Sequence, residues 1–226
     1  MRSRGAELIE HGSDYQEAYE HAQTLAQTQG YHMVPSFDDA LVRGVASYSL
    51  ELFREVSDIH TVYVPIGLGS GICGAIAARD ALGIKAAIVG VVPDAAPAYG
   101  QSFAKRTVIA QPVGPTLADG IACRTPNAEA LEIIVKGVER IVIVDEREIH
   151  SAMRALFTDT HNVAEGAGAA ALAAALRERS ANRHRRVAVV QTGGNVDASV
   201  FAQVLANDVD QQCGTQAPSA DTQAST

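Results

Sequence analysis

Residues 67–74, GLGSGICG, place four glycines within eight positions, and the segments on either side of them leave few folds open to the chain. The segment directly follows an apolar, largely β-branched run at 61–66, TVYVPI, and leads into an alanine-rich stretch at 72–82. Such a run is typical of a strand buried on both faces, and the alanine-rich stretch predicts a helix. The sequence therefore predicts a buried strand, a tight glycine turn and a helix in direct succession.

The same alternation continues along the chain. Apolar runs predict three more strands, at 86–92, 140–144 and 187–191, and residues 7–10 are a short strand candidate. Five further segments predict helices, at 14–29, 40–55, 146–157, 164–179 and 198–207. Polar residues stand where the N-caps of the first three belong: Ser13 or Asp14, Asp38 or Asp39, and Asp145. Alternating strands and helices predict a three-layer α/β fold, in which a mainly parallel sheet carries helices on both faces.

Charge and composition exclude several classes of protein. The 226 residues are 47% hydrophobic, with a formal net charge of −8 and no basic stripe, which is unsuited to nucleic acid or an anionic membrane surface. No apolar stretch is long enough to cross a membrane, and the N-terminal residues lack the apolar core of a secretory signal. The three cysteines form no CxxC pair, so we expect a reduced, cytoplasmic protein. Residues 210–226 are polar and are expected to form a disordered tail.

The carboxyl ends of parallel strands are where such folds bind ligands, and the glycine segment lies at one of them. Glycines there let a ligand approach the backbone, and the unpaired amides of a helix start attract phosphate. Close packing of strand and helix is the alternative explanation. Gly69, Gly71 and Gly74 also match the dinucleotide pattern G-x-G-x-x-G, with Asp94 as the later acid. That match is short, and Asp94 stands beyond Pro93 rather than at the end of the predicted strand.

A second loop, QTGGN at 191–195, follows the last predicted strand. Its Thr192 hydroxyl can meet a flat heteroaromatic ring, although a left-handed turn before the next helix also explains the two glycines. Asp119 and Arg124 are candidates for the mouth of the same site, and turn formation explains Asp119 equally well.

The segment VYVPIGLGSGICG resembles the phosphate loop of the fold-type II pyridoxal-phosphate enzymes, which share the tryptophan synthase β-like fold, and specifically that of the threonine/serine dehydratase family. Four more segments resemble that family in the same order along the chain: HMVPSFDDALVRGVASYSLEL, PTLADGIACRTP, TDTHNVAEGAGAAALAA and VVQTGGNVD. The resemblance implies an ammonia-lyase that uses pyridoxal 5'-phosphate to deaminate a β-hydroxy amino acid to a 2-oxo acid. It leaves open threonine against serine as substrate, and dehydratase against racemase.

The resemblance also implies roles for particular residues. Five residues would offer backbone amides to the cofactor phosphate: Gly67, Leu68, Gly69, Ser70 and Gly71. Thr192 would face the pyridine nitrogen, and Glu165 would lie near the ring, although capping the next helix is an alternative for Glu165. At the family's divalent-cation site this chain has Val92, Ala96 and Ala98, so we expect no metal there.

Two family motifs are missing, the S-F-K-like motif with the Schiff-base lysine and the S-S-G-N-H-like motif that holds the substrate. The three lysines, Lys85, Lys105 and Lys136, have the surroundings of surface residues, so no catalytic residue is assigned in this chain. We therefore expect an N-terminally incomplete fold, with residues 1–40 as a remnant of the small lobe and 41–209 as the large cofactor-binding lobe. The expected partners are a small amino acid and either a complementing N-terminal fragment or further copies of the chain. A non-catalytic pyridoxal-phosphate-binding subunit and, less favoured, a Rossmann oxidoreductase are the alternatives.

Overall fold

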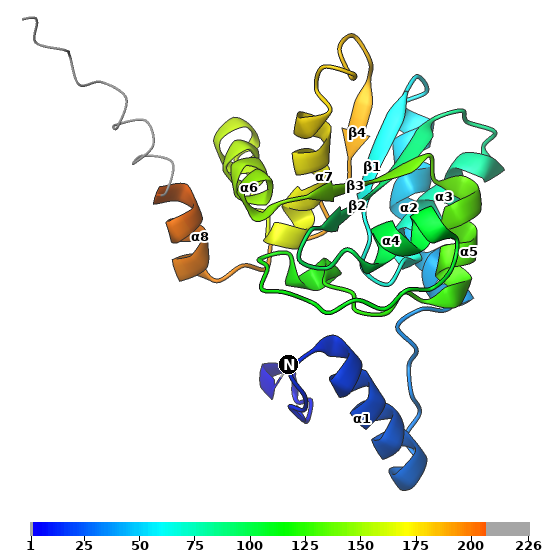
Figure 1. The fold of residues 1–226 in the computed structure, drawn as a ribbon, viewed down its shortest axis with the longest axis vertical. Coiled ribbons are helices and arrows are strands. Elements are labelled where there is room, and N and C mark those ends of the chain that lie inside the picture. Colours follow the sequence, from blue (N-terminus) through cyan, green and yellow to red (C-terminus); the bar gives the residue numbers. More distant parts are fainter. Residues whose placement is uncertain (1, 207–226) are drawn as a thin grey trace, which may run out of the picture.

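The computed structural model describes residues 2–206, which form a four-stranded parallel sheet covered by helices on both faces (Figure 1). The strands are β1 (Thr61–Pro65), β2 (Ala87–Pro93), β3 (Arg140–Val144) and β4 (Val187–Val189). They lie in the order β3-β2-β1-β4, so that β1 and β2 are central. Thr61 pairs with Ala87 on one side and with Val187 on the other, which aligns the carboxyl ends of three strands at one edge.

The two faces of the sheet bury different sets of side chains. Val62 and Val64 point to one face and Tyr63 to the other, as the period of two in a strand requires. The first face packs against α2 (Asp39–Glu55), α3 (Ser70–Ala81), α4 (Ala98–Lys105) and α5 (Ala128–Gly137). The second packs against α6 (Glu146–Thr160), α7 (Gly166–Arg177) and α8 (Ala198–Ala206). The three-layer α/β prediction is therefore confirmed.

The predicted elements differ from the structure in a few places. Residues 7–10 form no strand, because the segment is largely exposed and has no neighbouring strand to pair with. The helices α4 and α5 were not among the predicted elements. Asp14, Asp38 and Asp145 do cap their helices, and Asp145 with Glu148 forms a full capping box. The tail predicted at 210–226 lies outside the described residues. Among the residues described, no helix is long and apolar enough to cross a membrane.

The N-terminal arm, residues 2–38, stands apart from this sheet (Figure 1). Its helix α1 (Tyr15–Gln29) follows a short 3₁₀ turn (Arg2–Arg4) and has no buried residue. The arm meets the body through an ion pair of 2.8 Å between Asp14 and Arg124. The helix α2 is the first to pack against the sheet layer, which it does mainly through α3.

Candidate functional site

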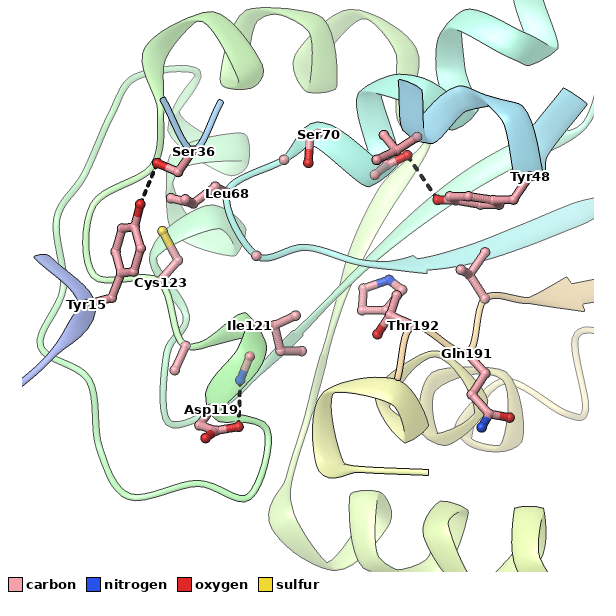
Figure 2. Close-up of a pocket in the computed structure, with 18 of the residues that line it drawn as sticks. Tyr15, Ser36, Tyr48, Leu68, Ser70, Asp119, Ile121, Cys123, Gln191 and Thr192 are labelled. Carbon is pink, nitrogen blue, oxygen red and sulfur yellow. Dashed lines mark hydrogen bonds between the residues drawn. The ribbon is translucent and has the colours of Figure 1, made fainter. Parts of the chain in front are cut away.

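A cavity of about 890 Å³ opens at the carboxyl ends of β1 and β4 (Figure 2). This volume suits a cofactor or substrate, since ligand pockets range from about 300 to 1,000 Å³. Its walls come from the glycine loop, from residues 119–123, from the end of β4 and from one face of α2, with two residues of the N-terminal arm. The lining residues include Gly67, Leu68, Gly69, Ser70, Gly71, Tyr48, Asp119, Cys123 and Thr192.

The glycine loop enters α3 with its first amides free. In the part of the chain that the structure describes, the backbone amides of residues 67–72 donate no hydrogen bond to another residue. Gly69, the N-cap of α3, has φ of 107° and lies in the left-handed region. A Cβ there would come within 2.7 Å of the Ala130 Cβ, so the position strongly favours glycine. The loop is therefore built to present unpaired N–H groups at the start of a helix.

The charges around the cavity fit binding of an anion by backbone alone. Among the described residues that line it there is no lysine or arginine, and Asp119 is the one carboxylate. The Asp119 side chain accepts a hydrogen bond of 2.7 Å from the Gly120 amide, so it also serves the turn. An anion at this place would be held by the free amides and the positive end of the α3 dipole.

Thr192 lines the same cavity, and no described residue hydrogen-bonds its hydroxyl. The QTGGN loop is not a left-handed turn, because neither Gly193 nor Gly194 has a positive φ. Close packing requires the two glycines instead. A Cβ on Gly193 would lie 2.6 Å from the Glu165 Oε1, and one on Gly194 would lie 2.4 Å from the Val163 carbonyl oxygen.

Glu165 is hydrogen-bonded to the QTGGN loop. Its carboxylate accepts a hydrogen bond of 3.0 Å from the Asn195 amide, and its own amide donates to the Gly193 carbonyl at 3.1 Å. Its side chain does not cap α7, which contradicts the capping alternative. Glu165 is not among the residues that line the main cavity, and it faces a smaller one of about 320 Å³ beside α8. Direct contact between Glu165 and a cofactor ring stays a prediction.

The three lysines lie away from the cavity. Lys85, Lys105 and Lys136 are exposed, and none lines it. Asp94, the acid of the dinucleotide reading, directly follows β2 but is exposed and also does not line the cavity. Asp94 therefore does not supply the acidic residue that a dinucleotide site would need at this cavity.

Cys73 and Cys123 are buried, and so are the three residues at the position of the family's cation site. Burial raises the pKa of the Cys73 thiol to about 12 and that of the Cys123 thiol to about 11, so both are protonated at neutral pH. Val92, Ala96 and Ala98 are buried apolar residues. Across residues 2–206, no three His, Cys, Asp or Glu side chains gather in a way that would hold a metal ion.

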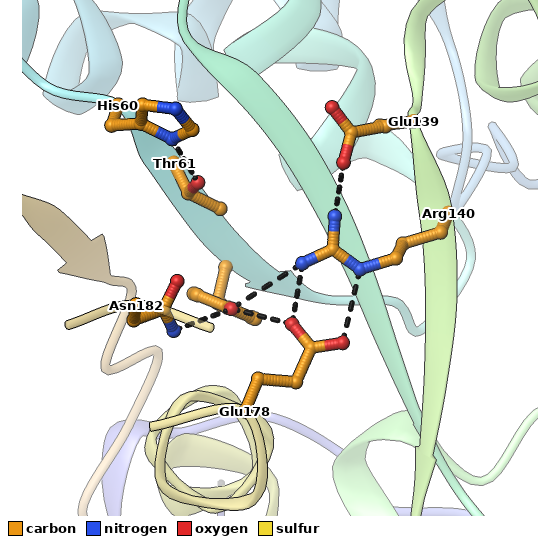
Figure 3. Close-up of polar contacts among 7 residues, drawn as sticks. His60, Thr61, Glu139, Arg140, Glu178 and Asn182 are labelled. Carbon is orange, nitrogen blue, oxygen red and sulfur yellow. Dashed lines mark hydrogen bonds and ion pairs between the residues drawn. The ribbon is translucent and has the colours of Figure 1, made fainter. Parts of the chain in front are cut away.

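A second polar cluster lies toward the amino ends of the strands, away from the cavity (Figure 3). Arg140 at the start of β3 binds Glu178 after α7 through two hydrogen bonds, of which Nε to Oε1 measures 3.0 Å. The Tyr63 hydroxyl donates to the same carboxylate at 2.6 Å and accepts from Asn182 at 2.8 Å. Arg140, Glu178, Tyr63 and Asn182 hydrogen-bond to one another, so the cluster ties the end of α7 to the sheet.

This cluster gives a pH-dependent stability. The Arg140 guanidinium beside Glu178 holds the pKa of that carboxyl below its ordinary value. A carboxyl of this kind adds stability above its unfolded pKa of about 4.3, which is lost as the pH falls through the folded-state pKa. We expect Glu178→Gln to lower the free energy of unfolding by about 2 kcal/mol at neutral pH. The variant should then lose less stability than the wild type on acidification, as measured by urea unfolding at a series of pH values.

Glu139→Gln is the matched control for Glu178→Gln. Glu139 pairs with the same arginine, but its side chain is 58% exposed. An exposed pair contributes less than about 1 kcal/mol. Equal losses in the two variants would contradict the special role of Glu178.

Two tyrosines at the site were missed by sequence reasoning. The Tyr48 hydroxyl donates to the Gly71 carbonyl at 3.2 Å, and the Tyr99 hydroxyl donates to the Leu68 carbonyl at 2.7 Å. Neither stands in a glycine motif, and only the packing of α2 and α4 brings them to the loop. The structure thus collects six of the seven predicted site residues around one cavity and adds these two beside the loop.

Comparison with known proteins agrees with this arrangement. The family described as pyridoxal-phosphate dependent enzyme matches residues 1–193. The L-threonine ammonia-lyase of Geobacter sulfurreducens is 37% identical over 205 residues, which are 90% of this chain and 51% of that protein. Threonine deaminase isoform 2 of Solanum lycopersicum superposes with a TM-score of 0.83 at 26% identity, over 91% of this chain and 58% of that one. Maize serine racemase shares the fold, with a TM-score of 0.80 at 24% identity, over 94% of this chain and 66% of that one.

These proteins are longer than the present sequence, which spans about half the length of the curated relatives it matches. The family match itself covers most of the chain, including β1, the glycine loop and Thr192. The chain therefore belongs to the family of pyridoxal-phosphate dependent enzymes, in the group that includes the threonine and serine dehydratases.

Proposed function

We propose that this chain forms the phosphate-binding and ring-binding part of a pyridoxal-phosphate-dependent ammonia-lyase. The whole enzyme would deaminate a β-hydroxy amino acid, serine or threonine, to a 2-oxo acid and ammonia. The observation that carries the proposal is the row of free amides at 67–72, which opens α3 at a cavity that also holds Thr192. The names of the relatives, L-threonine ammonia-lyase and threonine deaminase, support the reaction class.

The described residues fit the phosphate side of this cofactor. The amides at the start of α3 would hold the phosphate, and the Ser70 hydroxyl, which has no described partner, would add a further donor. The Thr192 hydroxyl would meet the pyridine nitrogen. Because a hydroxyl is neutral, it would not keep that nitrogen protonated as a carboxylate would. Bound pyridoxal phosphate supplies an electron sink for the α-carbon of an amino acid, and a moderate one suits loss of a β-hydroxyl group.

The described residues that line the cavity do not include the lysine that would anchor the cofactor. All three lysines are exposed and lie outside the cavity. We propose that the lysine comes from a polypeptide segment equivalent to the part of the relatives that this sequence does not match. That segment would also supply the base for the α-proton, since no histidine or lysine is among the described residues that line the cavity and the Asp119 carboxylate there serves the turn at Gly120.

Titration of the purified chain with pyridoxal phosphate tests both parts of this proposal. We expect saturable binding, detected by visible absorbance, with no lysine modified after borohydride reduction and peptide mapping. Adding the unmatched part of a full-length threonine ammonia-lyase as a separate polypeptide should then restore 2-oxo acid formation from threonine or serine.

Three other outcomes would change the conclusion. Specific modification of Lys85, Lys105 or Lys136 with turnover would show that the site is complete within this sequence. Binding that no added segment converts to activity would favour a non-catalytic cofactor-binding subunit. Absence of pyridoxal-phosphate binding would contradict the proposal as a whole.

A further inference from the structure

The glycine loop is held by two phenol groups that come from different helices. Tyr99 of α4 is 1% exposed, and its hydroxyl donates to the Leu68 carbonyl at 2.7 Å. Tyr48 of α2 is half-buried, and its hydroxyl donates to the Gly71 carbonyl at 3.2 Å. The two tyrosines thus bind the first and the last part of the segment whose amides are free.

These bonds fix the direction of the amides. In a trans peptide the carbonyl and the next N–H point in opposite directions. When Tyr99 binds the Leu68 carbonyl, the Gly69 N–H is therefore turned away from Tyr99. The bond from Tyr48 orients the peptide between Gly71 and Ile72 in the same way. The loop contains three glycines in five residues, and without such bonds it would lose its geometry readily.

Tyr99 also ties the loop to a second element. Its oxygen accepts a hydrogen bond of 3.2 Å from the Asn127 amide, at the N-terminus of α5, and Gly69 packs against Ala130 in that helix. Burial raises the pKa of the Tyr99 hydroxyl and that of the Tyr48 hydroxyl. Both groups therefore stay protonated and remain donors at neutral and moderately alkaline pH.

We propose that Tyr48 and Tyr99 are positioning residues that hold the amides of residues 69–72 ready for a phosphate group. The inference rests on the proposed function, because the phosphate concerned is that of pyridoxal phosphate. Each tyrosine would act through the loop, because it binds the carbonyl of a peptide whose N–H would bind the phosphate, and Tyr99 does not line the cavity. A preorganised anion site avoids the cost of ordering a flexible loop when the ligand binds.

Three tyrosine-to-phenylalanine variants separate this role from a general contribution to folding. Tyr99→Phe and Tyr48→Phe each remove one donor to the loop. Tyr63→Phe is the matched control, because Tyr63 is fully buried and its hydroxyl donates to Glu178 in the cluster toward the other end of the sheet. The dissociation constants of pyridoxal phosphate, of pyridoxal, which lacks the phosphate, and of inorganic phosphate are measured below the unfolding temperature of each variant.

We expect Tyr99→Phe to raise the dissociation constants of pyridoxal phosphate and inorganic phosphate by about tenfold, which is the effect of one lost hydrogen bond. Affinity for pyridoxal should stay unchanged. Tyr48→Phe should weaken the same two ligands by a smaller factor, since its bond is longer and half-exposed. Tyr63→Phe should lower the unfolding temperature with no change in any of the three affinities.

Unchanged phosphate affinity in both loop variants would overturn the inference, and so would an equal loss for pyridoxal. If Tyr99→Phe does not fold, Tyr48→Phe decides the matter by the same comparison. If the wild-type chain binds neither pyridoxal phosphate nor inorganic phosphate, the proposed function fails and the inference fails with it. Wild-type binding with unaffected variants overturns the inference alone.

Discussion

Gly69→Ala is expected to remove detectable pyridoxal-phosphate binding and to lower the free energy of unfolding by about 3 kcal/mol. Two effects add. The left-handed φ of 107° is unfavourable for alanine by about 1–2 kcal/mol, and a Cβ at 2.7 Å from the Ala130 Cβ overpacks a buried contact. Relief of this contact must move the loop away from α5, which disturbs the amides that would bind the phosphate. The unfolding temperature should fall by about 6–12 °C, as measured by calorimetry.

Gly83→Ala is the control that isolates backbone strain. Gly83 also has a positive φ, of 64°, but an added Cβ would meet nothing within 4 Å. We expect a loss of about 1 kcal/mol and no change in cofactor affinity. Identical results for Gly69→Ala and Gly83→Ala would show that the contact with Ala130 has no importance for the loop.

The sheet was predictable because its strands are encoded locally. Each of the four is a mostly apolar run, and β3 has the predicted bounds at 140–144. The segment at 7–10 has only two apolar residues between two glutamates and no strand beside it, and a sequence pattern does not show which segments will find a partner strand. The helix α5 shows the opposite case. Asn127 caps it, and Ala130, Leu131 and Ile134 form its buried face. The capping residue and the helical spacing of apolar residues that indicate a helix are therefore present in the sequence.

The residues of the site likewise fall into two groups, those that a local motif predicts and those that depend on tertiary packing. The glycine loop and Thr192 were predictable because each belongs to a short contiguous motif at the end of a strand. The tyrosines were not, since Tyr48 is 23 residues before Gly71 and Tyr99 is 31 residues after Leu68. Their role depends on how α2 and α4 pack around the loop. The role of Glu165 was not predictable either, since its partner, the Asn195 amide, lies 30 residues away and the contact depends on tertiary packing.

Gly168→Ala is expected to destabilise the protein by about 3 kcal/mol, although alanine normally favours a helix. Gly168 lies in α7, where a Cβ would come within 2.3 Å of the Gly193 carbonyl oxygen and 3.0 Å of the Gly193 nitrogen. Both atoms belong to the backbone, so no side-chain rotation relieves the contact. Either α7 shifts or residues 193–195 move outward, and Thr192 moves with them.

The helical control for this variant is Gly44→Ala in α2. Gly44 is exposed, and an added Cβ there would lie in open space. Alanine should therefore raise the free energy of unfolding by about 0.5–1 kcal/mol through helix propensity. Urea unfolding of the two variants should give changes of opposite sign, and a stabilised Gly168→Ala variant would contradict the close packing of α7 on the QTGGN loop.

The ligand affinities of the Gly168→Ala variant give a second, independent test of how α7 packs on the QTGGN loop. If Thr192 meets the pyridine ring, its displacement should lower the affinity for pyridoxal. Inorganic phosphate would bind at the other side of the cavity, so its affinity should be the same as in the wild type. This pattern is the reverse of that expected for Tyr99→Phe. Because the two loops are held by different helices, each variant should disturb one end of the cofactor and leave the other in place. Loss of both affinities in Gly168→Ala would instead mean that α7 and the glycine loop move as one unit.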